Sequence, residues 1–78
     1  MYSAIRFRSA TYTFRARQAL ERAGITSMVI RAPGRVSGEG CGYMLKVKSK
    51  DLPRVLEILE RQRIAHQEVF APWKEGTR

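Results

Sequence analysis

The sequence predicts an α+β fold in which strands and helices follow the order βαββαβ. Three observations carry this prediction. Four short segments alternate apolar and polar residues or are rich in β-branched ones, two longer segments repeat apolar residues at helical spacing, and each helical segment lies between two strands. A length of 78 residues leaves room for one domain, to which we assign residues 1–71, with residues 72–78 as a C-terminal tail.

Residues 3–8 are predicted to open the chain as a half-buried strand, because apolar residues alternate with arginines there. Ser9 offers an N-cap oxygen for the following helix, or Thr11 does so if the helix begins later. Gly24 is expected to end that helix, as the glycine after its last turn. The apolar stripe of this helix is narrow and consists mostly of small residues, namely Tyr12, Ala16, Ala19, Leu20 and Ala23.

A second strand is expected at residues 25–32, which are rich in β-branched residues, and a glycine-rich loop follows it. The third strand is expected at residues 43–49. Its two faces alternate, with Tyr43, Leu45 and Val47 on one side and Met44, Lys46 and Lys48 on the other.

The second helix is predicted to start at a cap formed by Ser49 or Asp51, with Pro53 tolerated in its first turn. A fourth strand is expected at residues 64–71, where a proline stops it. The buried stripe of the second helix comprises Leu52, Val55, Leu56, Ile58 and Leu59.

This order of elements is that of the ferredoxin-like fold, built from two similar βαβ halves. Each half makes a right-handed crossover, which gives a four-stranded antiparallel sheet of spatial order 4-1-3-2 with both helices on one face. A swapped dimer, in which the last strand pairs with a second copy of the chain, is the alternative.

Gly40 and Gly42 flank Cys41, the one cysteine of the chain. In the predicted topology the loop that holds Cys41 lies at the end of the sheet where the first helix begins. The N–H groups at a helix start, backbone N–H groups turned inward beside glycines, and arginines all lower the pKa of a thiol from about 8.5. The residues expected to stabilise a thiolate there are Arg8, Ser9, Thr11 and Arg35.

This set of residues fits a carrier that receives a group on sulfur better than a complete enzyme, because no base, oxyanion hole and substrate pocket come together. The sole histidine, His66, is interpreted as a half-buried strand residue. One cysteine and one histidine are too few for a structural zinc site, so we expect neither a metal nor a cofactor. The alternative is that Cys41 is an inert small hydrophobe and that the glycines only form a turn.

A formal net charge of +8 fits either a solvated, soluble surface or anionic partners such as nucleic acid, acidic protein faces or phosphorylated ligands. No stacking platform for bases is expected on the sheet face away from the helices, because Phe7 and Tyr43 alternate toward the helices. Specific nucleic-acid binding is therefore disfavoured and only nonspecific contact is left open. Phe14 and Met44 are candidate exposed hydrophobes of an interface, and a homodimer is left open. The basic residues expected on the open sheet face are Arg6, Arg8, Lys46 and Lys48.

No apolar run is long enough to cross a bilayer, the N-terminus lacks the apolar stretch of a signal peptide, and a lone cysteine forms no internal disulfide. These features favour a cytoplasmic location without membrane contact.

The sequence resembles a family of small bacterial domains described as putative selenium/sulfur carrier protein-like. The resemblance covers about residues 2 to 70 and is carried by three stretches. These are "FRSATYTFRARQALERAGI" (7–25), "RAPGRVSGEGCG" (31–42) and "DLPRVLEILERQRI" (51–64), of which the proline-to-GCG loop is the most specific.

The resemblance implies that Cys41 carries the transferred group, that Gly40 and Gly42 shape its loop, and that Ser9 is the motif serine at the helix start. It implies a carrier of sulfur or selenium, bound as a persulfide-type group and loaded by cysteine desulfurase or sulfurtransferase proteins. A non-catalytic module that binds a small anion or another protein, with an inert cysteine, is the alternative function.

Overall fold

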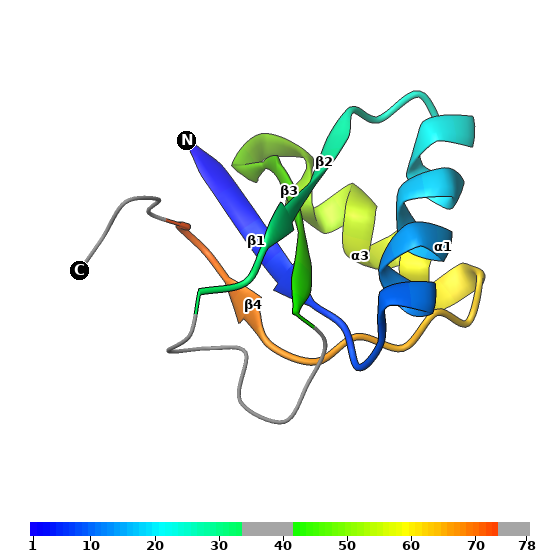
Figure 1. Cartoon of the computed structure of the whole chain (residues 1–78). Coiled ribbons are helices and arrows are strands. Elements are labelled where there is room, and N and C mark those ends of the chain that lie inside the picture. The colour runs from blue at the N-terminus through cyan, green and yellow to red at the C-terminus, as the bar shows by residue number, and fades with distance from the viewer. Residues whose placement is uncertain (34–41, 74–78) are drawn as a thin grey trace.

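The elements of the protein follow the predicted order in the residues that the computed structural model describes, 1–33 and 42–73 (Figure 1). The first half of the chain forms β1 (Tyr2–Arg6), α1 (Ala10–Arg22) and β2 (Ser27–Arg31). The second half forms β3 (Tyr43–Lys48), a 3₁₀ turn η1 (Ser49–Asp51), α3 (Leu52–Arg61) and β4 (Val69–Phe70).

The strands form one antiparallel sheet of order β2-β3-β1-β4, which confirms the predicted topology. In the central pair, Tyr2 of β1 lies opposite Lys48 of β3, and Arg6 lies opposite Met44. On the other side of β3, Arg31 at the end of β2 lies opposite Tyr43. This register brings the end of β1, the end of β2 and the start of β3 to one end of the sheet.

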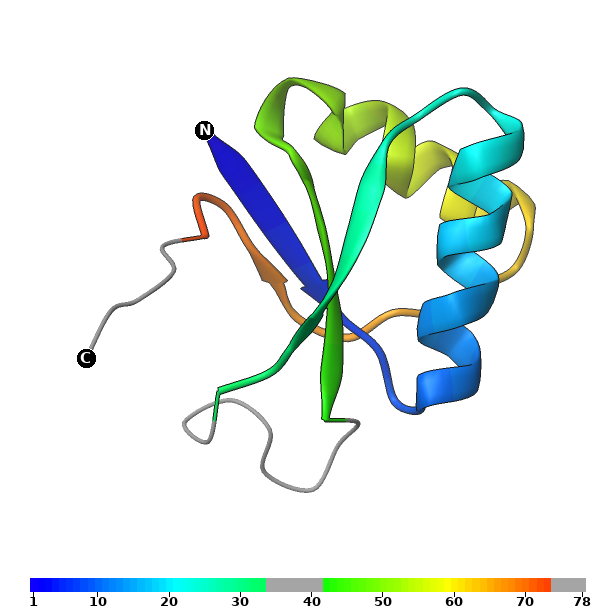
Figure 2. The ribbon, with the colours of Figure 1, turned by 45° about the horizontal axis from the view of Figure 1, so that its top comes forward.

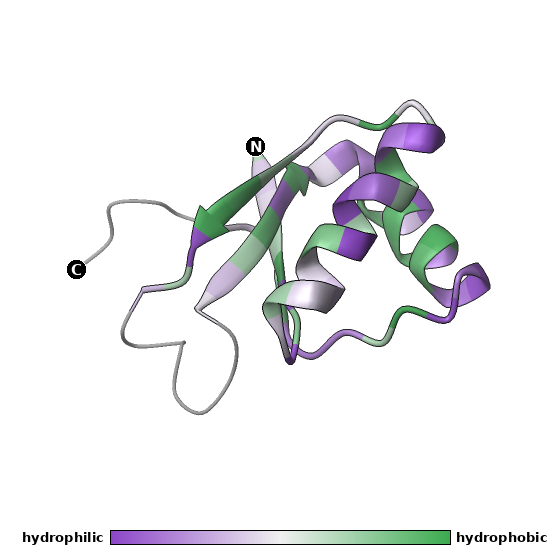
Figure 3. Ribbon diagram, turned by 45° about the vertical axis from the view of Figure 1, so that its right-hand side comes forward, coloured by the Kyte–Doolittle hydropathy of each residue, from purple (hydrophilic) through white to green (hydrophobic). Residues whose placement is uncertain are grey.

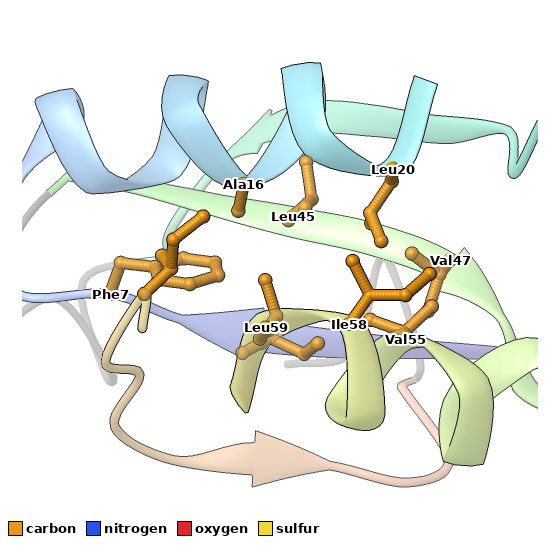
Figure 4. Close-up of a cluster of buried hydrophobic side chains, with 10 residues drawn as sticks. Phe7, Ala16, Leu20, Leu45, Val47, Val55, Ile58 and Leu59 are labelled. Carbon is orange, nitrogen blue, oxygen red and sulfur yellow. The ribbon is translucent and has the colours of Figure 1, made fainter. Parts of the chain in front are cut away.

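Both helices cover the same face of the sheet, with their hydrophobic sides turned toward it (Figure 3). Ile5 and Phe7 are fully buried beneath them, as the alternation in the first strand predicts. The close-up in Figure 4 shows side chains from α1, α3 and β3 pointing into this core. The buried members are Ile5, Phe7, Ala16, Leu20, Leu45, Val47, Val55, Ile58, Leu59 and Ile64.

The start of the second helix differs from the prediction. Neither Ser49 nor Asp51 caps α3 through its side chain. A 3₁₀ turn precedes the helix instead, and the hydroxyl of Ser49 lies 2.8 Å from the hydroxyl of the buried Ser3. Pro53 does lie in the first turn of α3, as expected.

The fourth strand is much shorter than the predicted 64–71. Ile64 lies just beyond α3, and its N–H donates to the carbonyl of Leu59 in the last turn of the helix at 2.9 Å. Arg63 just before it adopts a left-handed conformation with φ of 57°, which turns the chain back toward the sheet. Ladder-like hydrogen bonds between Arg6 and the backbone of Gln67 and Glu68 extend the contact beyond β4 itself.

The sheet face opposite the helices is partly covered, which corrects two expectations. Met44 was predicted to be exposed, yet it is fully buried beside Trp73, which is only 8% exposed. The N–H of Trp73 donates to the carbonyl of Tyr2 at 2.7 Å, so the chain after β4 stays against β1. The hydrophobic cluster on this face comprises Ala4, Ala32, Met44 and Trp73, with Ile30 and Phe70 packed against it.

Aromatic side chains from β1 and the C-terminal segment also lie on this face. Phe70 and Trp73 contact each other edge to face with ring centroids 5.5 Å apart. The Nζ atom of Lys46 lies 4.5 Å from the ring centroid of Tyr2. The predicted basic lining is also incomplete, because Arg8 lies beyond the end of β1.

Candidate functional site

The loop that contains the cysteine joins β2 to β3, and its two stems are held together. The N–H of Ala32 donates to the carbonyl of Gly42 at 2.8 Å, directly beyond the last ladder pair of Arg31 and Tyr43. Gly42 is exposed, and a methyl group at its Cβ position would meet no atom within 4 Å. Three predicted site residues, Arg35, Gly40 and Cys41, lie outside the described residues.

The first helix begins at the same end of the molecule. Figure 2 shows the start of α1 and the start of β3 side by side at the end where β2 also finishes. Contact between two aromatic rings confirms this arrangement. The ring centroids of Phe14, in the second turn of α1, and Tyr43, at the start of β3, are 6.2 Å apart.

Ser9 is the N-cap of α1, so the first of the two predicted caps is confirmed. Its backbone is extended, with φ of −151° and ψ of 161°, and its Oγ accepts from the N–H of Tyr12 at 3.3 Å. The Ser9 carbonyl accepts from both the N–H and the Oγ1 of Thr13, each at 3.1 Å. Thr11 lies exposed in the first turn, where it does not form the cap.

The electrostatic character of this end is positive. No acidic residue lies in the first turn of α1, so nothing there offsets the partial positive charge of the helix start. Arg8 is exposed directly before the cap. Arg31, at the end of β2, places its guanidinium carbon 5.9 Å from the ring centroid of Tyr43. Positive groups therefore outnumber acidic ones among the described residues named here, although Glu68 pairs with Arg6 at the same end at 2.7 Å.

The contacts of Tyr43 with Phe14 and with Arg31 are the part of this site that sequence reasoning missed. Phe14 falls on the arginine-rich side of its helix, which pointed to a role outside the core. The sequence did not show that this side reaches the start of β3, because helical periodicity gives a face but no neighbour.

His66 lies in the exposed segment between α3 and β4 rather than in a strand. Its Nδ1 is 2.9 Å from the carbonyl of Gln67. A hollow of about 500 Å³ lies beside it, lined by Leu56, Leu59, Glu60, Arg63, Ile64, Ala65 and His66.

Within the described ranges, no three His, Cys, Asp or Glu side chains gather in a way that could hold a metal ion. No helix among the described residues has the length and apolar character needed to cross a membrane.

Comparison with known proteins gives one match. Residues 2–71 match the family described as "Putative Se/S carrier protein-like". Searches of curated proteins and of solved structures find no match. Because the match covers the whole βαββαβ unit, including both stems of the cysteine loop, the chain belongs to this Se/S carrier-like family.

Proposed function

We propose that the protein carries sulfur or selenium as a persulfide-type group on Cys41. The observation that carries this proposal is the convergence of three features at one end of the domain. These are the Ser9-capped start of α1 and the two stems of the β2–β3 loop, within which Cys41 lies in the sequence. Membership of the Se/S carrier-like family supports the same function.

The transfer step is an exchange between two sulfur centres. The Cys41 thiolate attacks the outer sulfur of a persulfide on a donor protein, so that a new S–S bond forms at Sγ. The S–S bond of the donor breaks, the donor cysteine leaves as a thiolate, and the transferred sulfur keeps its proton. Neither an oxidant nor a reductant is consumed. Unloading repeats the step with the acceptor as nucleophile.

Each predicted site residue has a part in this proposal. The start of α1, which Ser9 caps and in whose first turn Thr11 lies, stabilises the thiolate by its positive charge together with Arg8 and Arg35. Gly40 and Gly42 leave the sulfur open to the active site of a partner, because they add no side chains beside it.

The partners that fit this chemistry are cysteine desulfurases and sulfurtransferases, which form persulfides on their own cysteines, and the reducing cytoplasm is the compartment that keeps the thiol available. The chain then works with an enzyme rather than completing a reaction alone.

The test is mass spectrometry of the protein after incubation with a cysteine desulfurase and cysteine. We expect the mass of one added sulfur on the peptide that contains Cys41, and none on a Cys41→Ser variant. Dithiothreitol must remove the added mass, because a sulfinic acid has nearly the same mass and resists thiols. No reducible addition would contradict the proposal and favour a binding module with an inert cysteine.

A further inference from the structure

We propose that Phe14, Tyr43 and Arg31 form a docking surface for an acidic, partly apolar segment of the partner protein. This surface, called the Phe14 patch below, consists of described residues from α1, β3 and β2. The inference rests on the proposed function only for the identity of that partner as the enzyme that loads or unloads Cys41.

Exposure of aromatic side chains is the first reason. Phe14 is 46% exposed and Tyr43 is 37% exposed, although their rings contact each other. Two touching aromatic side chains that remain open to water are a larger apolar target than single exposed residues. Aromatic residues together with arginine are also the residue types that carry most of the binding energy in protein interfaces.

Position is the second reason. Tyr43 follows Cys41 by two residues and is the first residue of β3. Phe14 lies one turn after the Ser9 cap. A protein that places its active site over the cysteine loop therefore meets the Phe14 patch beside it.

The positive charge around the Phe14 patch is the third reason, because it favours an acidic partner segment. Arg31 lies against the Tyr43 ring, and α1 contributes three arginines but a single glutamate. Carboxylates on the partner are attracted to such a surface, whereas a second copy of this chain, with its formal charge of +8, is repelled. Stacking of nucleic-acid bases fits less well, because Phe14 and Arg31 already contact the ring of Tyr43.

The docking test uses a Cys41→Ser protein, so that its result does not depend on sulfur chemistry. A short end-blocked peptide of alternating glutamate and leucine is titrated into the ¹⁵N-labelled protein and followed by NMR. The control peptide has lysine in place of every glutamate. We expect the acidic peptide alone to shift the amide signals of Phe14, Arg31 and Tyr43.

Three variants test whether the acidic peptide binds at the Phe14 patch. Phe14→Ala is expected to raise the dissociation constant of the acidic peptide about tenfold, which is the effect of removing one anchoring side chain from an interface. Arg31→Glu is expected to abolish binding of the acidic peptide and to permit the lysine peptide. Met28→Ala is the matched control, because Met28 is 58% exposed on β2 and lies outside the patch.

Several results would overturn the inference. These are equal shifts with both peptides, an unchanged affinity in the Phe14 variant, tighter binding of polyuridylate at the same residues, or the same shifts on raising the protein concentration alone. If the peptide binds as expected while the wild-type protein takes up no sulfur, the docking surface stands and the carrier function fails. If the wild-type protein takes up sulfur but does not distinguish the acidic peptide from the lysine peptide, the carrier function stands and the docking surface fails.

Discussion

The two βαβ halves of the chain place a serine at the same point, between an inner strand and a helix. Ser9 follows β1 and caps α1, with its Oγ bonded to the N–H of Tyr12. Ser49 follows β3, yet its hydroxyl bonds to Ser3 and leaves the start of α3 without a side-chain cap. The first serine caps a helix at the end of the sheet where the stems of the cysteine loop lie, while the second links η1 to β1.

The outer strands of the two halves differ in a similar way. The register of β2 with β3 runs from Ser27 to Arg31, whereas the ladder of β4 with β1 comprises Val69 and Phe70, extended by two hydrogen bonds to Arg6. The second half compensates with Trp73, which packs onto the open face of the sheet. The comparison indicates that the first half has the longer outer strand and a capped helix start, and that the second half depends on tertiary contacts for its outer strand.

Removal of Trp73 tests this dependence and has the largest expected effect. Trp73→Ala should lower the free energy of unfolding by about 3 kcal/mol or more, because a large buried side chain leaves a cavity on the sheet. Met28→Ala on β2 should cost no more than about 0.5 kcal/mol, since the side chain is exposed. Urea unfolding followed by circular dichroism measures both. If the Trp73 variant fails to fold, Trp73→Phe should fold with a smaller loss. If Trp73→Ala were as stable as the wild-type protein and the Met28→Ala variant, the proposed role of Trp73 would be refuted.

The different roles of Ser9 and Ser49 provide the second test. Ser49→Ala should cost about 1–3 kcal/mol, because it takes the partner from the buried Ser3 hydroxyl. Ser9→Ala should cost about 1 kcal/mol, the usual value of an N-cap. The double variant Ser3→Ala with Ser49→Ala should recover most of the loss, since neither hydroxyl then remains unsatisfied. Additive losses in the double variant would show that the two hydroxyls do not interact.

The helix ends give the smallest expected effect. Gly24 after α1 has φ of 80°, and Arg63 after α3 has φ of 57°, so both halves turn through the left-handed region. Gly24→Ala should destabilise the protein by about 1 kcal/mol, because only backbone strain opposes the methyl group. Arg63→Gly should stabilise it by at most about 1 kcal/mol. The Tm should then fall by a few degrees in the Gly24→Ala variant and rise by a few degrees or less in the Arg63→Gly variant. A shift in the same direction for both would contradict the equivalence of the two helix ends.

Local signals in the sequence predicted the order of elements, the strand order and the Ser9 cap. Alternation placed Phe7 under the helices, and helical spacing placed Val55 and Leu59 in the core. The glycine after α1 marked its end correctly. The strand order follows from the order of elements by the right-handed crossover rule, and the other features depend on residues close together in the chain, which is where periodicity and capping rules apply.

The parts that the sequence did not reveal depend on contacts between distant residues. Met44 is apolar on a strand face that otherwise carries lysines, and it is buried in a cluster with Ala4, Ala32 and Trp73. Residues 64–68 were included in the predicted fourth strand. Ile64 instead bonds back to Leu59 in the last turn of α3, after the left-handed turn at Arg63. The contact between Phe14 and Tyr43 likewise required the sheet register.

The most direct measurement of the central claim is the alkylation rate of Cys41 with iodoacetamide at neutral pH. The control is a blocked peptide of residues 38–44, which has the same neighbours, including Glu39, but lacks the fold. If the positive end of the domain activates the thiol, the folded protein reacts several-fold faster than the peptide, and Ser9→Ala reduces the difference while Ser49→Ala does not. A folded protein that reacts no faster than the peptide would contradict the account, because the helix start and the arginines would then leave the sulfur unaffected.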